Sequence, residues 1–214
     1  MSDAGTGYLV HPDAGPGPGV LLLHSWWGLT DQVKDLANQL ADAGFTALAP
    51  DLLAGAHPET SAEAELTLEA ADIDATAGLV LSSATALRSQ TRDPRAPVGV
   101  VGYSMGASWA YWLSVRLPQS VSCVVSYYGT QNIEFDDSQS SYLVHIAETD
   151  ELASDDETNE TLALLGLAGR PFDVYRYDET QHWFAEPDRP GHHEAAAALA
   201  WDRTIAFLAD HLQR

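Results

Sequence analysis

The sequence predicts an α/β fold, a mostly parallel sheet with helices on both faces. Three observations indicate this. Strand-like apolar runs alternate with helical ones along the chain. An apolar strand at residues 98–101 runs directly into a Gly-x-Ser-x-Gly turn. The 214 residues are enough for one sizeable core, and no repeat or linker divides them, so we expect residues 1–214 to form a single domain.

The elements follow from short patterns. The expected strands are residues 20–24, 45–50, 98–101, 121–127, 142–147 and 172–177. The expected helices are residues 30–43, two pieces within 61–90 with a break near Gly78, 107–115, 155–167 and 192–212.

Particular residues set the ends of these elements. Residues 1–19 are rich in Gly and Pro near their end, and we expect a flexible segment or an edge strand there. In the first helix, Thr30 is the expected N-cap and Gly44 the expected C-cap. The last helix has Trp201 and Leu208 on one apolar face.

The Gly-x-Ser-x-Gly pattern at residues 102–106 predicts a nucleophile elbow. The strand ends in a turn so tight that its neighbours must lack side chains, and Gly102 and Gly106 meet that need. Ser104 stands at the tip of the turn. It is the predicted nucleophile, and the buried helix at 107–115 follows at once.

A serine hydroxyl needs a base to take its proton and an acid to orient that base. In this fold the acid follows the nucleophile along the chain and the histidine comes last, at the carboxyl ends of strands. We expect Asp150, after strand 142–147, to be the acid, with Glu148 as the main alternative. His182 lies in the loop after the last strand and is the expected base.

The oxyanion of the reaction needs backbone donors. One is expected from Met105, the residue after the nucleophile, and the second from Trp26, in the loop after the first central strand. Ser25 and Trp27 are candidate residues of the substrate pocket, although the tryptophans equally fit core packing. Whether Ser25 donates a hydrogen bond or only fills space stays open at this stage.

Composition narrows the function. The 31 acidic and 10 basic residues give a net charge of −21, which disfavours nucleic acids and anionic membranes as partners. No leader or membrane-spanning run is evident, so we expect a cytoplasmic protein.

Cys123 is the single cysteine and is expected to be buried, as is His145 in its strand. No metal-binding spacing or phosphate loop occurs, so we expect no metal and no cofactor.

Several segments together resemble the dienelactone hydrolase family of α/β-hydrolases. They are HSWWGL at 24–29, APDL at 49–52, GYSMG at 102–106, AETD at 147–150 and HWFA at 182–185. The resemblance covers about residues 20–212. It implies an α/β-hydrolase fold and hydrolysis of an ester or lactone by a nucleophile–His–Asp triad.

Three positions depart from the type enzymes of that family. Ser104 replaces their nucleophilic cysteine, and Ser25 stands where they have a glutamate. Glu186, four residues after the predicted base, stands where they have an arginine for an anionic lactone. An acidic residue at the mouth of the active site would repel an anion, so we expect a neutral or cationic ester or small lactone as substrate.

The sequence therefore predicts a serine hydrolase that acts on small carboxylic esters or lactones through an acyl-enzyme. Acyl transfer or amide cleavage by the same triad is an alternative, since the same geometry permits it. A binding protein on a hydrolase scaffold is another, because a fold alone does not define a function. Whether the chain is a monomer or a homodimer also stays open.

Overall fold

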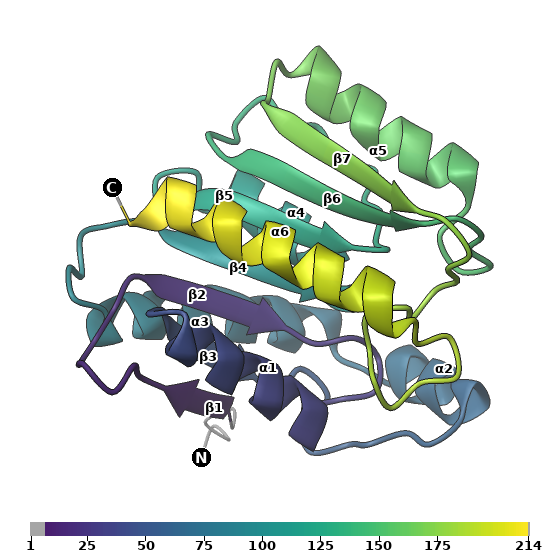
Figure 1. The fold of residues 1–214 in the computed structure, drawn as a ribbon, viewed down its shortest axis with the longest axis horizontal. Helices are drawn as coiled ribbons and strands as arrows, with labels where there is room; N and C mark the ends of the chain where they lie inside the picture. Colours follow the sequence, from purple (N-terminus) through teal and green to yellow (C-terminus); the bar gives the residue numbers. More distant parts are fainter. Residues whose placement is uncertain (1–6, 214) are drawn as a thin grey trace.

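A seven-stranded sheet forms the centre of the molecule in the computed structural model, which describes residues 7–213 (Figure 1). Its strands are β1 (Gly7–Val10), β2 (Gly19–Leu23), β3 (Thr46–Pro50), β4 (Val98–Tyr103), β5 (Val121–Tyr127), β6 (Ser141–Ala147) and β7 (Phe172–Tyr177). Their order across the sheet is β1-β3-β2-β4-β5-β6-β7. Each neighbouring pair is parallel except β1 and β3, which are antiparallel at one edge. The predicted α/β fold class is confirmed.

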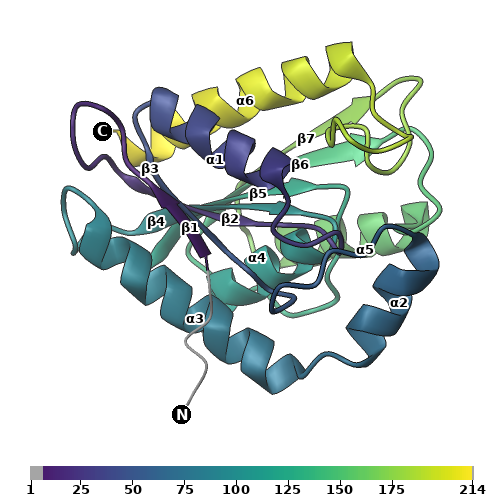
Figure 2. The same ribbon diagram turned by 90° about the horizontal axis from the view of Figure 1, so that it is seen from below.

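Helices cover both faces of this sheet. They are α1 (Asp31–Asp42), α2 (Ser61–Glu69), α3 (Ile73–Gln90), α4 (Met105–Arg116), α5 (Asp155–Leu167) and α6 (Glu194–Leu212). Figures 1 and 2 show α1 and α6 on one face and α3, α4 and α5 on the other. Side chains alternate between the faces along each strand. In β2, Val20 and Leu22 accordingly join the core under α1 and α6, whereas Leu21 and Leu23 join the opposite core.

The N-terminal part of the chain contributes the edge of the sheet. Residues 7–10 form β1, which pairs with β3 from Gly7 opposite Pro50 to Val10 opposite Ala47. Residues 1–6 of the predicted N-terminal segment lie outside the described residues.

The ends of α1 follow the predicted signals closely. Thr30 is the N-cap, and its hydroxyl accepts a hydrogen bond from the Val33 amide at 3.4 Å. The C-cap is Ala43, one residue earlier than expected. Gly44 follows it with φ of +94°, a conformation that glycine adopts without the usual steric cost.

We expected the break between these two helices near Gly78. It lies instead at residues 70–72, between α2 and α3. Asp72 has an extended backbone, and its carboxylate accepts a hydrogen bond from the Ala75 amide at 3.0 Å, so it caps a new helix. Gly78 lies inside α3, where an added Cβ would meet no atom within 4 Å. The capping carboxylate therefore outweighs the weak helix propensity of one glycine.

Two polar residues were expected in the core and are found there. The Cys123 thiol is fully buried, and burial raises its pKa to about 12. His145 is also fully buried and lies within hydrogen-bonding distance of the Tyr177 and Thr204 hydroxyls. Burial lowers the His145 pKa to about 3, so this imidazole is a neutral link between the sheet and α6.

Over residues 7–213, none of the helices is long and apolar enough to cross a membrane.

The position of Gly78 gives a test of the helix assignment. Replacing Gly78 with Ala is expected to raise the free energy of unfolding by about 0.5–1 kcal/mol, since it removes backbone entropy from the unfolded chain without creating a clash. Urea denaturation measures the change. The matched variant Gly102→Ala is expected to lower stability, because its Cβ would lie 2.4 Å from the Gly106 carbonyl oxygen. A Gly78→Ala variant that is less stable than the wild type would contradict a continuous α3.

Candidate active site

Ser104 lies at the junction between β4 and α4, with φ of 51° and ψ of −115°. This conformation is strained for a residue with a side chain, and close packing enforces it. A Cβ on Gly102 would lie 2.4 Å from the Gly106 carbonyl oxygen, and one on Gly106 would lie 2.1 Å from the Leu23 carbonyl oxygen of β2. Only glycine fits these two positions, and the turn directs the serine hydroxyl away from the sheet.

His182 joins Ser104 to Asp150. The His182 Nε2 atom is 2.9 Å from Ser104 Oγ, and its Nδ1 atom is 2.7 Å from both carboxylate oxygens of Asp150. A carboxylate only accepts, so Nδ1 carries the ring hydrogen and Nε2 is left to accept the serine proton. The side chains of His182 and Asp150 are only 6% and 8% exposed. The amides of Leu152 and Ala153 donate to the Asp150 carboxylate and fix its orientation.

The alternative acid lies elsewhere. The carboxylate of Glu148 accepts a hydrogen bond from the Glu179 amide, and Glu148 is exposed. The structure thus brings Asp150, and not Glu148, to the imidazole of His182. Glu148 lies one residue past β6 and is held by the Glu179 amide, whereas Asp150 lies two residues further along the loop.

Three tryptophans stand beside the histidine. The ring centroids of Trp26, Trp27 and Trp183 are 5.4–5.5 Å apart, and the Trp183 ring is 4.1 Å from that of His182. Trp183 has a positive φ of 72°, so its backbone is also strained. Ala64 of α2 packs on Trp26 and Trp27. Figure 2 shows α2 at the end of the sheet where the parallel strands terminate. The three rings form one largely buried aromatic cluster, which contacts the His182 ring through Trp183.

The two expected oxyanion donors lie in a turn and at a helix start. Trp26 belongs to the turn of residues 25–28, which Gly28 closes with φ of +87°, and Met105 is the first residue of α4. In the described chain, no turn, loop or cap hydrogen bond between backbone groups uses the amide of Trp26 or Met105. Both amides are therefore free of a backbone acceptor.

His24 is a residue of this loop to which the sequence analysis assigned no role. Its Nε2 atom accepts from the Leu52 amide at 2.9 Å, and its Nδ1 atom donates to the Ser25 carbonyl at 2.6 Å. Burial lowers the His24 pKa to about 4, consistent with this neutral form. The imidazole joins the loops after β2 and β3 and holds the turn that contains Trp26. Its place directly after a central strand was the signal available in the sequence.

The position of the Glu186 carboxylate differs from the expected one. The sequence placed this carboxylate at the mouth of the site, whereas the structure directs it inward to two hydroxyl groups. Ser25 Oγ donates to Glu186 Oε2 at 2.7 Å, and the Tyr128 hydroxyl donates to Oε1 at 3.0 Å. Burial raises the Glu186 pKa to about 7, and the two hydrogen bonds oppose that rise. Ser25 therefore does donate a hydrogen bond.

The remaining histidines show no metal-binding arrangement. In the part of the chain that the structure describes, no three His, Cys, Asp or Glu side chains are grouped to hold a metal ion.

The last helix, α6, begins at Glu194, two residues later than expected. His193 is its N-cap, and its ring accepts a hydrogen bond from the Ala196 amide.

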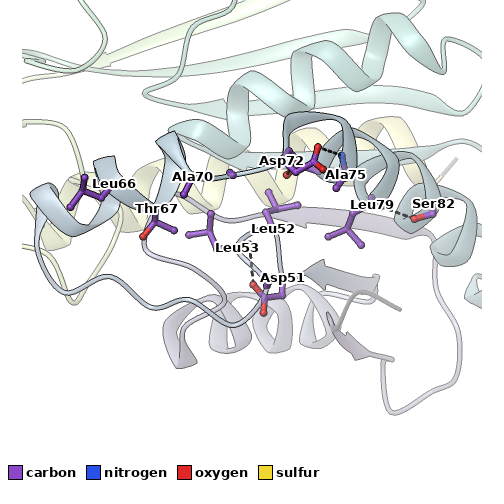
Figure 3. A pocket seen from close by; sticks show the side chains of 13 residues that line it. Asp51, Leu52, Leu53, Leu66, Thr67, Ala70, Asp72, Ala75, Leu79 and Ser82 are labelled. Carbon is purple, nitrogen blue, oxygen red and sulfur yellow. Dashed lines mark hydrogen bonds between the residues drawn. The ribbon is translucent and has the colours of Figure 1, made fainter. Parts of the chain in front are cut away.

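A groove of about 960 Å³ lies between the loop after β3, α2 and the first half of α3 (Figure 3). Its walls are largely apolar and include Leu52, Leu53, Leu66 and Leu79. None of the predicted site residues lines it. The sequence did not reveal this groove, since its walls come from three segments whose packing no local pattern encodes.

Comparison with known proteins places the chain in a family. The model of the dienelactone hydrolase family matches residues 6–212. A carboxymethylenebutenolidase of Pseudomonas putida is 26% identical over 212 residues, covering 92% of this chain and 88% of that protein. Protein usf of Aquifex pyrophilus is 26% identical over 216 residues, covering 96% of this chain and 93% of the relative.

Solved structures show the same fold. A dienelactone hydrolase-like promiscuous phosphotriesterase from metagenomic libraries superimposes with a TM-score of 0.85 at 24% identity, covering 96% of this chain and 92% of that one. An esterase of Thermogutta terrifontis gives a TM-score of 0.73 at 11% identity, covering 95% and 86%. With a family model that spans nearly the whole chain, the conclusion is direct: this protein belongs to the dienelactone hydrolase family of α/β-hydrolases.

Proposed function

We propose that this chain is a serine hydrolase that cleaves small carboxylic esters or lactones through Ser104, His182 and Asp150. Membership of the dienelactone hydrolase family supports the hydrolysis of ester bonds. The single observation that carries the finer assignment is the unbroken hydrogen-bonded series from Ser104 Oγ through the imidazole to the Asp150 carboxylate. The proposed acid, base and nucleophile form this series without any movement of the chain.

The reaction would proceed in two halves. Ser104 Oγ forms a bond to the substrate carbonyl carbon while its proton passes to His182 Nε2. The tetrahedral intermediate then breaks its bond to the alkoxy oxygen, which takes the proton from His182, and the acyl group stays on Ser104. A water molecule then forms a bond to the acyl carbon and gives its proton to His182 Nε2. The bond between the acyl carbon and Ser104 Oγ breaks, Oγ takes the proton from His182, and the carboxylic acid is released. Asp150 stabilises the imidazolium formed in each half.

The amides of Trp26 and Met105 would hold the oxyanion in both intermediates. Their lack of backbone acceptors supports this role, as does the position of Met105 at the N-terminus of α4, where the helix dipole favours negative charge. Each such donor contributes about 3 kcal/mol to stabilisation of a transition state.

The proposed substrates are neutral esters or lactones with a compact apolar acyl group. The aromatic cluster that contacts His182 through Trp183 favours an apolar group, and a chain of net charge −21 disfavours an anion. With Glu186 turned inward, this preference rests on the overall charge and no longer on a carboxylate at the mouth.

Loss of the nucleophile or the base is the first test. In hydrolysis of p-nitrophenyl acetate, Ser104→Ala and His182→Ala are each expected to lower kcat at least ~1,000-fold, since members of a triad act as a unit. Ser89→Ala, an exposed serine on α3, is the matched control and should retain wild-type kcat. Full activity in folded Ser104→Ala would exclude the mechanism. A wild-type protein that hydrolyses no ester would favour a binding protein on this scaffold.

Exchange of the two nearby acids tests the third member. Asp150→Asn is expected to lower kcat by about 10⁴-fold, because an amide in that place favours the wrong tautomer of His182. Glu148→Gln keeps the Asp150–His182 contact and is expected to change kcat by less than about tenfold. Both variants are measured by steady-state kinetics on the same ester. The reverse ranking would mean that Glu148 is the acid.

A further inference from the structure

The mechanism above gives no role to the carboxyl group of Glu186, although it joins three loops. Glu186 lies in the loop between β7 and α6, Ser25 in the loop after β2, and Tyr128 directly after β5. The carboxyl group receives a hydroxyl donor from each of the other two loops, at 2.7 and 3.0 Å. One side chain thus connects three of the segments that meet at the carboxyl end of the sheet.

Each hydroxyl donor is next to a group that the proposed reaction uses. Ser25 precedes Trp26, whose amide is a proposed oxyanion donor. The Tyr128 ring lies 4.7 Å from the imidazole of His182, measured between ring centroids. Tyr128 also has a positive φ of 38°, a strained conformation that its contacts must maintain. A change at Glu186 would therefore alter the positions of both the Trp26 turn and the His182 imidazole.

We propose that Glu186 is a positioning residue, whose ionised carboxyl group holds the Trp26 turn and the Tyr128–His182 contact in the arrangement that turnover requires. This inference rests on the proposed function of Ser104 and His182. It assigns Glu186 no contact with the substrate: its effect passes through Ser25 and Tyr128.

The protonation state of Glu186 decides whether this arrangement is complete. An ionised carboxylate only accepts, so it satisfies both hydroxyl donors at once. A protonated carboxyl group donates through one of its oxygens, so one of the two hydroxyls must change from donor to acceptor. The two contacts, one hydroxyl on each carboxyl oxygen, fit the ionised form.

The surroundings place that change near neutral pH. Burial raises the Glu186 pKa to about 7, with Asp188 raising it further and Arg189 lowering it. Other titratable groups packed nearby are His24, Tyr103 and Tyr128, and a cavity of only about 10 Å³ separates Glu186 from His24, Tyr103 and α1. The pKa of His24 is lowered to about 4 and those of both tyrosines are raised well above 10, so these three stay neutral near pH 7.

The test compares kcat for p-nitrophenyl acetate in the wild type and in Glu186→Gln from about pH 5.5 to 9. Glutamine keeps the size of the side chain and, like the protonated acid, has one donor and one acceptor group. The wild type and the variant should therefore have similar kcat below pH 6, where Glu186 is protonated. Their kcat ratio should rise through about pH 7 to about tenfold, with KM nearly unchanged, since small displacements of catalytic groups have large effects on rate. A pH effect that is common to both proteins cancels in the ratio.

Further variants separate positioning from a general effect of charge. Glu160→Gln removes an exposed carboxylate of α5 and should leave the kcat ratio at one across the range. Ser25→Ala and Tyr128→Phe each remove one hydroxyl donor. Each is expected to lower kcat above pH 7, and by less when Glu186→Gln is already present, because the partners are coupled.

The outcomes are distinct. No ester hydrolysis by the wild type would mean that the proposed function fails. An active wild type with a kcat ratio to Glu186→Gln that stays constant with pH would overturn the positioning role, whatever the stability of the variant. If Glu186→Gln does not fold, Ser25→Ala and Tyr128→Phe decide: unchanged kcat in both overturns the inference, and a loss above pH 7 supports it.

Discussion

The close approach of three backbone segments around Ser104 is the constraint on which the site depends. The carbonyl of Leu23 in β2, the first turn of α4 and the end of β4 lie so near one another that a single methyl group at residue 102 or 106 would clash. This packing places the serine on a strained backbone at the start of a helix. It also brings the loop after β2 beside Ser104. The proposed nucleophile and the proposed oxyanion donors therefore come from the same close packing.

Parallel strands complete the arrangement. β2, β4, β5, β6 and β7 end at one edge of the sheet, and each contributes a group there: Trp26, Ser104, Tyr128, Asp150 and His182, in that order. No single loop could hold these groups with comparable accuracy, because loops are mobile and strands are fixed by their ladders. Hydrogen bonds between the loops then make the last adjustments. His24 joins the loops after β2 and β3, and Glu186 joins those after β2, β5 and β7.

Local patterns were sufficient to predict much of this molecule. Apolar runs located six of the seven strands, β2 to β7. The glycines at 102 and 106 predicted the turn at Ser104 because that turn has a steric requirement visible in five residues. The order of serine, acid and histidine then selected residues that the structure brings within 2.7–2.9 Å. The family resemblance is confirmed over residues 6–212.

Features that depend on tertiary contacts could not be predicted. The direction of the Glu186 side chain is decided by Ser25, 161 residues away, and by Tyr128, 58 residues away. The start of α3 is decided by one capping carboxylate, Asp72, and not by Gly78, where the sequence predicted the break. The packing of Ala64 on the tryptophans and the groove between α2, α3 and the loop after β3 arise from segments with weak patterns of their own.

Covalent labelling measures whether Ser104 is an activated nucleophile. The folded protein is treated with a fluorophosphonate probe, and the adduct is counted by intact mass and located by peptide mapping, alongside His182→Ala. If His182 activates Ser104, we expect one adduct per chain, on Ser104, that forms far more slowly without His182. No adduct on the folded wild type, or an adduct on Ser104 that forms equally fast in His182→Ala, would contradict it.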